Sequence, residues 1–407
     1  MKAVFSKIGK GFKQRSIQVF IVLAMYALFS SYFSVTTNQL FYTFSVFIKD
    51  ILLWVMPITV GFFIAHTVQS FERRAPIFVL ILLSFEAFSN FSSVWYAFFC
   101  AHSITDYLPA LQSVSIESDF KALWRLPVTR PSWWSADKGA LVGLVLGGIA
   151  AFSHGSHLNR FINQGKGWMQ RLLVQGFCRL IPLYILGFVA QMYQTKFLVH
   201  VFNHYAIIVL WLVLFLAIYL LLLFALGAGW SFTRMMTNMK NLLPAGGIAL
   251  TSACSLSTMP WTIEATAKTL RNPDLAKALI PATTNIQQIG DCIANAFLCF
   301  LIYQNFYGTT PDLMTWLHFS VVFMIARFAT AAVQGGAIFI MLPIYETYLD
   351  FNGEMIALIL ALNVVLDPLI TSCNVLANGA LCRTFEKVWG GVQALLGKPL
   401  PSGANIL

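Results

Sequence analysis

Polar residues recur along one face of the apolar segment near the carboxyl end of the chain. Successive spacings of +4, +4, +3 and +4 place five side chains on one helical stripe: Asn363, Asp367, Thr371, Asn374 and Asn378. A lone Asn inside an apolar helix usually serves helix packing, but a buried carboxylate is costly and marks a functional site by default. The stripe therefore predicts a polar binding site.

Two other apolar segments carry similar polar faces at helical spacing. One presents Gln287, Asp291 and Asn295, and the other presents Glu86 and Asn90 with Ser89 and Ser93 nearby. Carboxylates and amides gathered in one core suit the binding of an amine or a cation together with a small polar solute. The chain shows no Ser/His/Asp arrangement and no metal-ligand motif, so these faces do not indicate an enzyme.

The composition indicates that membrane-spanning helices position these polar faces. Of 407 residues, 58% are hydrophobic and only 10% are charged, whereas soluble domains carry about 25% charged residues. This excludes a soluble enzyme and a disordered chain. At about 20 apolar residues per crossing, the chain has room for roughly eight to ten membrane spans. The sequence thus predicts an all-α polytopic membrane protein, with an uncleaved first span at its N-terminus.

Two apolar segments, 242–270 and 317–349, are interrupted by Gly, Ser and Pro. Backbone polar groups cannot stay unpaired in lipid, so a broken helix must line protein or a water-filled cavity. A pair of such segments points to the binding site of a secondary transporter. We expect both to be re-entrant hairpins with tips at 252–258 and 332–337; the alternative is two kinked spans.

The basic residues support this arrangement. The chain holds 26 Lys and Arg against 16 Asp and Glu. If eight segments cross and the two interrupted segments return, most of the basic residues fall on one side, as the positive-inside rule requires. This places both termini in the cytoplasm.

Three motifs resemble the dicarboxylate/amino acid:cation symporter family, which has the glutamate-transporter fold. Residues 255–262, Ser-Leu-Ser-Thr-Met-Pro-Trp-Thr, resemble its serine-rich first hairpin tip. Residues 333–337, Val-Gln-Gly-Gly-Ala, resemble the tip of its second hairpin, and the stripe from Asp367 to Asn378 is similar to its eighth span. The resemblance follows the span order through most of the chain and is detailed from about 243 to 388.

The resemblance implies an elevator-type transporter of eight transmembrane helices plus two re-entrant hairpins. It places scaffold spans 1 and 2 in 1–75, span 3 and an external polar loop in 76–138, scaffold spans 4 and 5 in 139–200, a transport core in 201–388 and a cytoplasmic tail in 389–407. Within the core it implies span 6, a first hairpin at 242–270, span 7 at 278–303, a second hairpin at 317–349 and span 8 at 355–382.

The family pattern also implies substrate-binding residues: Ser255, Ser257, Thr258, Gly335, Gly336, Asp367, Ile370, Thr371 and Asn374. In the family, the position of Ile370 is an Arg that holds a side-chain carboxylate. Without that guanidinium, a side-chain carboxylate has no bidentate partner. Among small amino acids and dicarboxylates, we therefore predict a neutral amino acid as substrate.

Cation coupling departs further from the family pattern. The family's closing sodium-binding Asp is Asn378 here. The family's seventh-span motif Asn-Met-Asp-Gly-Thr aligns with residues 287–291, where Ile289 stands at the position of the cation-binding Asp and Asp291 lies two positions later. Candidate cation-binding residues are Glu86, Ser89, Asn90, Gln287, Asp291, Asn363, Asn374 and Asn378. Our hypothesis is that Glu86 or Asp291 supplies the displaced charge for Na⁺ or H⁺, as a proton carrier if burial favours its neutral form. The alternative is a degenerate member that acts as an uncoupled transporter, an exchanger or a sensor.

Two further features concern packing and partners. Gly139, Gly143 and Gly147 form a tandem GxxxG, which indicates either close packing within the chain or an oligomer contact; the family resemblance implies a homotrimer. Lys49 and Asp50 are most simply an internal ion pair. We expect a bacterial inner-membrane protein with a small-molecule solute, no nucleic-acid partner and no cofactor other than the coupling ion.

Overall fold

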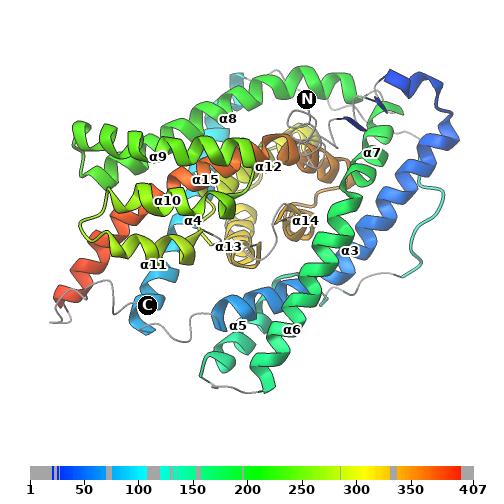
Figure 1. The fold of residues 1–407 in the computed structure, drawn as a ribbon. Coiled ribbons are helices and arrows are strands. Elements are labelled where there is room, and N and C mark those ends of the chain that lie inside the picture. The colour runs from blue at the N-terminus through cyan, green and yellow to red at the C-terminus, as the bar shows by residue number, and fades with distance from the viewer. Residues whose placement is uncertain are drawn as a thin grey trace, which may run out of the picture.

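The structure is a computed structural model that describes residues 21–22, 25–26, 28–69, 76–107, 120–128, 131, 133–134, 136–152, 157–194, 197–284, 286–330 and 337–395. Every regular element within these ranges is helical. The helices fall into two groups with a helix pair between them (Figure 1).

The first group packs around α3. Its helices are α3 (Val35–Gln69), α5 (Ala136–Phe152), α6 (His157–Arg171) and α7 (Cys178–Gln194), with a π-helical stretch at Leu172–Phe177 before α7. The glycine stripe of α5 lies against α3, because a Cβ at Gly139 or Gly143 would collide with the backbone of Pro57 or Gly61. Of the two roles that the tandem GxxxG allowed, the structure shows close packing within the chain.

The second group packs around the last helix. Its members are α4 (Pro76–Ile104), α8 (Phe197–Ala228), α9 (Phe232–Ser252), α10 (Ser255–Ala267), α11 (Asp274–Thr283), α12 (Ile289–Tyr307) and α15 (Gly353–Leu395). Residues 289–302 of α12 are all buried except Asp291, which is partly exposed. A helix that is apolar all round belongs in the middle of a fold, so α12 is the core against which α4 and α15 pack.

Helices α13 (Leu313–Thr330) and α14 (Ala337–Tyr348) lie between the two groups (Figure 1). Nζ of Lys49 on α3 is 3.0 Å from Oε1 of Glu346 on α14. Lys49 therefore pairs with a residue from the other half of the chain, and our expectation of a Lys49–Asp50 pair was wrong. Neighbours in sequence point to different faces of a helix, which is why the distant carboxylate is the better partner.

Four of the described helical segments are long and apolar enough to cross a membrane: Ile207–Ala228, Ile289–Tyr307, Leu313–Thr330 and Gly353–Leu395. Two bent pairs, Val35–Ile51 with Trp54–His66 and His157–Phe177 with Pro182–Gln191, raise the number to six if each is one span. The chain is thus an integral membrane protein with several apolar helices. The arrangement of eight spans and two hairpins remains a prediction.

The interrupted segments contain helix pairs. Helices α9 and α10 are separated at Ala253 and Cys254, where Ala253 adopts a left-handed conformation with φ of 48°. Helices α13 and α14 flank residues 331–336, which lie outside the described residues together with the predicted tip glycines Gly335 and Gly336. The predicted seventh span, 278–303, is interrupted between α11 and α12.

Candidate substrate and cation site

The break between α11 and α12 is closed by an amide from another helix. Asn90 of α4 is fully buried; its Nδ2 donates to the carbonyl oxygen of Ile286 at 2.8 Å, and its Oδ1 accepts from the backbone N–H of Gln288 at 3.2 Å. Non-helical backbone at membrane depth is tolerated only where protein groups satisfy it. Asn90 therefore stabilises the broken helix.

The N-terminus of α12 is capped by the polar stripe of α15. Oδ1 of Asn374 accepts from the backbone N–H of Gly290 at 2.8 Å and from that of Asp291 at 3.3 Å. The first N–H groups of a helix lack partners within it, and the N-cap residue Gln288 makes no side-chain cap of its own. Asn374 supplies the cap across the interface between α15 and α12.

Gly290 allows these helices to approach closely. A Cβ at this position would lie 2.6 Å from the carbonyl oxygen of Ile370 and 2.9 Å from Oδ1 of Asn374. Both separations are shorter than a Cβ can tolerate, so any larger residue would push α12 away from its cap.

Asp291 is the centre of a polar cluster that joins three helices. Its Oδ2 accepts from Nδ2 of Asn374 at 2.7 Å, and its Oδ1 lies 3.2 Å from Nη1 of Arg327 on α13. The Arg327 side chain has no exposed surface, and the Asp291 side chain is 18% exposed. A buried ion pair compensates two charges that would each be costly alone.

Further contacts hold Arg327 in place. Its Nη1 also donates to Oε1 of Gln288 at 3.2 Å, and the same oxygen accepts from the hydroxyl of Thr330 at 2.8 Å. The guanidinium lies 4.6 Å from the ring centroid of Phe323, a cation–π distance. Within the described part of the chain, Nε and Nη2 of Arg327 have no hydrogen-bond partner.

The two remaining amides of the stripe, Asn363 and Asn378, bind residues of α12 and α11. Nδ2 of Asn363 donates to Oδ1 of Asn295 at 2.8 Å, and Oδ1 of Asn378 accepts from the hydroxyl of Thr283 at 2.7 Å. All four of these residues are buried. The stripe thus follows α12 on one side of the break and α11 on the other, as membrane helices use amides to hold each other.

Helices α9 and α10 also pack against α15. The hydroxyl of Ser372 donates to the carbonyl oxygen of Gly246 on α9 at 2.9 Å, and a Cβ at Gly379 would meet Leu242 of α9 and Thr266 of α10. The predicted tip residues Ser255, Ser257 and Thr258 open α10. The hydroxyl of Thr258 is buried and donates to the carbonyl oxygen of Ser255 at 2.8 Å.

Glu86 lies apart from the ion pair. It is 2% exposed on α4, one turn before Asn90, and among the described residues nothing hydrogen-bonds to its Oε2. The hydroxyl of Ser89 and the side-chain amide of Gln287 are likewise buried without a partner in the described part. The described residues thus include one compensated carboxylate, Asp291, and, apart from it on α4, one buried carboxyl, Glu86, for which they supply no salt-bridge partner.

The substrate residues predicted on α15 lie along the same helix. Thr371 is buried and Asp367 is partly exposed. Ile370 is 1% exposed, and its carbonyl faces Gly290. The structure therefore brings Asn374 to Asp291 and encloses Ile370 between helices.

Sequence reasoning missed Arg327 as a member of the site. A charged residue inside an apolar segment is a functional candidate by default, with its partner to be named, and Arg327 carries that signal in 317–349. Its partner lies on another helix and leaves no periodic pattern, so spacing along the chain could not identify it.

The model of one family, the sodium:dicarboxylate symporter family, matches residues 139–388, which is more than half of the 407-residue chain. Among curated proteins, none matches. The matched region contains the broken α11–α12 segment, both interrupted helix pairs and the polar stripe of α15, so the resemblance drawn from the motifs is confirmed. Membership implies cation-coupled symport of dicarboxylates or amino acids and no enzymatic activity. This chain belongs to the sodium:dicarboxylate symporter family and is a membrane transporter.

Proposed function

We propose that this chain is a secondary active transporter of a small neutral amino acid and that it couples transport to protons. The observation that carries the choice of ion is the buried pair between Asp291 and Arg327, 3.2 Å apart. The guanidinium of Arg327 neutralises the charge of the Asp291 carboxylate, so that a bound cation is not needed to do so.

Sodium has few anionic ligands left in this cluster. Hard cations bind several oxygen ligands and are held more weakly as carboxylates are lost. Asp291 is occupied by Arg327 and Asn374, and Asn378, at the place of a family sodium ligand, is a neutral amide that accepts from Thr283. The geometry therefore favours a site that works without sodium.

Glu86 is our candidate proton carrier. An ionised carboxylate with no counter-charge is costly to bury, and Glu86 is 2% exposed with a partnerless Oε2 among the described residues. Its helix also carries Asn90, which holds the break before α12. Proton loss from Glu86 would then act, through α4 and Asn90, on the start of α12, where Asp291 lies.

The substrate proposal rests on the residues of α15. Asp367 would hold the amino group, and Thr371 with Asn374 would hold the α-carboxylate once Asn374 exchanges its contact with Asp291. The tips of the two hairpins, with Ser255, Ser257, Thr258, Gly335 and Gly336, would close over the solute. Ile370 offers no charge to a side-chain carboxylate, which favours a neutral substrate.

The proposed mechanism is alternating access, in which the group around α15 moves against the group around α3. The separate packing of these groups supports this partition (Figure 1). Net uptake requires that the affinity for the co-transported proton differ between the two states of the transporter.

We further propose a homotrimer in a bacterial inner membrane with cytoplasmic termini. The exposed apolar side chains of α5 opposite its glycines, among them Val145 at 62%, suit a subunit or lipid contact.

Proteoliposomes containing the full chain test these proposals. We expect labelled alanine, but not labelled aspartate, to exchange in counterflow, and alanine uptake to be driven by an inward proton gradient and to be indifferent to sodium. Uptake that requires sodium would overturn the proton proposal, and preferred exchange of aspartate would overturn the neutral substrate.

The same ion pair favours a second candidate function, an exchanger without ion coupling. An internal guanidinium that takes the place of a cation removes the need for one. Counterflow of alanine with no net uptake under either gradient would identify this function.

A further inference from the structure

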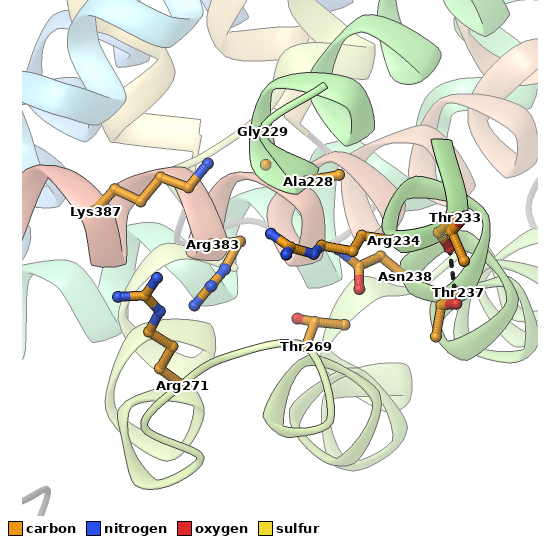
Figure 2. Close-up of a pocket in the computed structure, with 11 residues that line it drawn as sticks. Ala228, Gly229, Thr233, Arg234, Thr237, Asn238, Thr269, Arg271, Arg383 and Lys387 are labelled. Carbon is orange, nitrogen blue, oxygen red and sulfur yellow. Dashed lines mark hydrogen bonds between the residues drawn. The ribbon is translucent and has the colours of Figure 1, made fainter. Parts of the chain in front are cut away.

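A basic cavity lies beyond the end of the polar stripe, and nothing in the proposed transport cycle uses it. Its volume is about 260 Å³, and its walls come from the end of α8, the start of α9, the link after α10 and the last part of α15 (Figure 2). Figure 2 shows Arg234 of α9 extending toward Arg383 of α15, with Arg271 and Lys387 on the same side of the cavity.

Positive charge in this cavity is only partly compensated. The four cations are Arg234, Arg271, Arg383 and Lys387. Among the described residues, the ion pair between Arg383 and Glu386 is the one such pair they make. Glu386 also accepts from the backbone N–H groups of Arg271 and Asn272, so its oxygens are already well used.

Lys387 lies close to the other three cations of the cavity. It lies beyond the predicted span 355–382, and its Nζ donates to the carbonyl oxygen of Leu226 at 3.0 Å. The pKa of Lys387 is lowered, first by loss of hydration and then by the guanidinium groups of Arg383, Arg271 and Arg234. Three positive neighbours therefore act on the same ammonium group, and an anion in the cavity would relieve this repulsion.

Neutral donors complete the lining. Thr233 and Asn238 of α9 and Thr269 after α10 line the cavity. Helix α9 begins here, its N-cap residue Ser231 makes no side-chain cap, and the first N–H groups of a helix favour an anion. The turn before α9 is tight because Gly229 and Trp230 both have positive φ, which sets the start of α9 beside the end of α8.

We propose that this cavity binds a phosphoryl group, carried either by the headgroup of an acidic phospholipid or by a soluble phosphate. Guanidinium groups match phosphate oxygens in bidentate geometry, and Lys adds a point charge. A volume of about 260 Å³ is below the range of about 300–1,000 Å³ for drug-sized ligands, which suits one such group. All four cations lie on the cytoplasmic side in the predicted topology, where acidic headgroups attract basic residues.

The test uses the purified full chain and two probes, inorganic phosphate and phosphatidylglycerol. Phosphate is titrated while thermal unfolding is followed in detergent, and retention of phosphatidylglycerol over phosphatidylcholine is read by native mass spectrometry. The variant is Arg234→Gln with Lys387→Gln. The matched control is Lys240→Gln with Lys268→Gln, which removes the same charge from exposed residues outside the cavity. Arg234→Lys, which keeps the charge, serves if the double variant does not fold.

We expect wild type and the control to bind one probe, and the double variant to bind it about tenfold more weakly or worse. Arg234→Lys should bind more weakly than wild type but retain part of the affinity. A shift with phosphate identifies a soluble ligand, and selective retention of phosphatidylglycerol without that shift identifies a lipid headgroup. Equal binding by the double variant and its control, or no binding of either probe by wild type, would overturn the proposal.

Discussion

Nη1 of Arg327 lies 3.2 Å from Oδ1 of Asp291, and this contact links α13 to the capped start of α12. The other carboxylate oxygen of Asp291 accepts from Asn374 of α15 at 2.7 Å. One carboxylate therefore bridges an arm of the second interrupted segment, the broken helix and the polar stripe. Any motion of α13 relative to α15 must break one of these contacts.

The pair should show strong energetic coupling. Asp291→Asn leaves the Arg327 guanidinium buried without a counter-charge, and we expect it to lower the free energy of unfolding by about 3 kcal/mol. The double variant Asp291→Asn with Arg327→Met should regain most of this loss, because no buried charge remains. Unfolding in detergent compares both variants with wild type.

The exposed pair between Lys268 and Glu264 provides the control for this cycle. Lys268→Gln should leave stability unchanged, because solvent screens such a pair. Equal losses in Asp291→Asn and Lys268→Gln, or no recovery in the double variant, would contradict a coupled ion pair.

Removing the guanidinium should create a sodium response. Arg327→Gln leaves the Asp291 carboxylate free to bind a cation, so we expect sodium, but not choline, to raise the unfolding temperature of this variant. Wild type should show no such shift. Adding Asp291→Asn to Arg327→Gln should abolish the response, because the anionic ligand is then gone. An equal sodium shift in wild type and Arg327→Gln would show that Arg327 does not take the place of a cation.

Periodicity predicted the parts of the structure that lie along single helices. The stripe from Asn363 to Asn378 falls on α15 as one face because five polar residues share a helical spacing. The break in 242–270, which the structure places at Ala253 and Cys254, could be predicted because Gly and Pro disfavour a continuous helix. The composition alone was enough to indicate a helical membrane protein.

Contacts between distant segments could not be predicted in this way. The tandem GxxxG indicates close approach but does not name its partner, which is the α3 backbone at Pro57 and Gly61. Lys49 takes Glu346 as partner rather than its neighbour, and Asn90 closes a break in another helix. Such pairings depend on the tertiary fold and leave no local signal.

Glu86 should determine the pH dependence of transport. If Glu86 carries the proton, wild-type uptake rises as the external pH falls, since more carriers load a proton. Glu86→Gln is permanently neutral, so we expect it to lose uptake driven by a proton gradient while retaining counterflow exchange. Glu264→Gln on the exposed face of α10 is the control and should behave as wild type. Gradient-driven uptake by Glu86→Gln would show that the proton travels elsewhere.

Gly290 should be intolerant of even one added methyl group. In Gly290→Ala, the new Cβ would lie 2.6 Å from the carbonyl oxygen of Ile370, so α12 must move away from α15 at a cost of about 1–3 kcal/mol. That movement also weakens the cap from Asn374, so counterflow exchange should fall with stability.

Gly247→Ala on α9 is the matched control, because no heavy atom lies within 4 Å of its added Cβ. Replacing an unconfined helical Gly by Ala should raise stability by about 0.5–1 kcal/mol. The two substitutions add the same group to helices of the same transporter, so opposite signs in unfolding measurements would isolate the close approach of α12 and α15. Equal effects would mean that Asn374 and the start of α12 are not held together as tightly as their 2.8 Å hydrogen bond indicates.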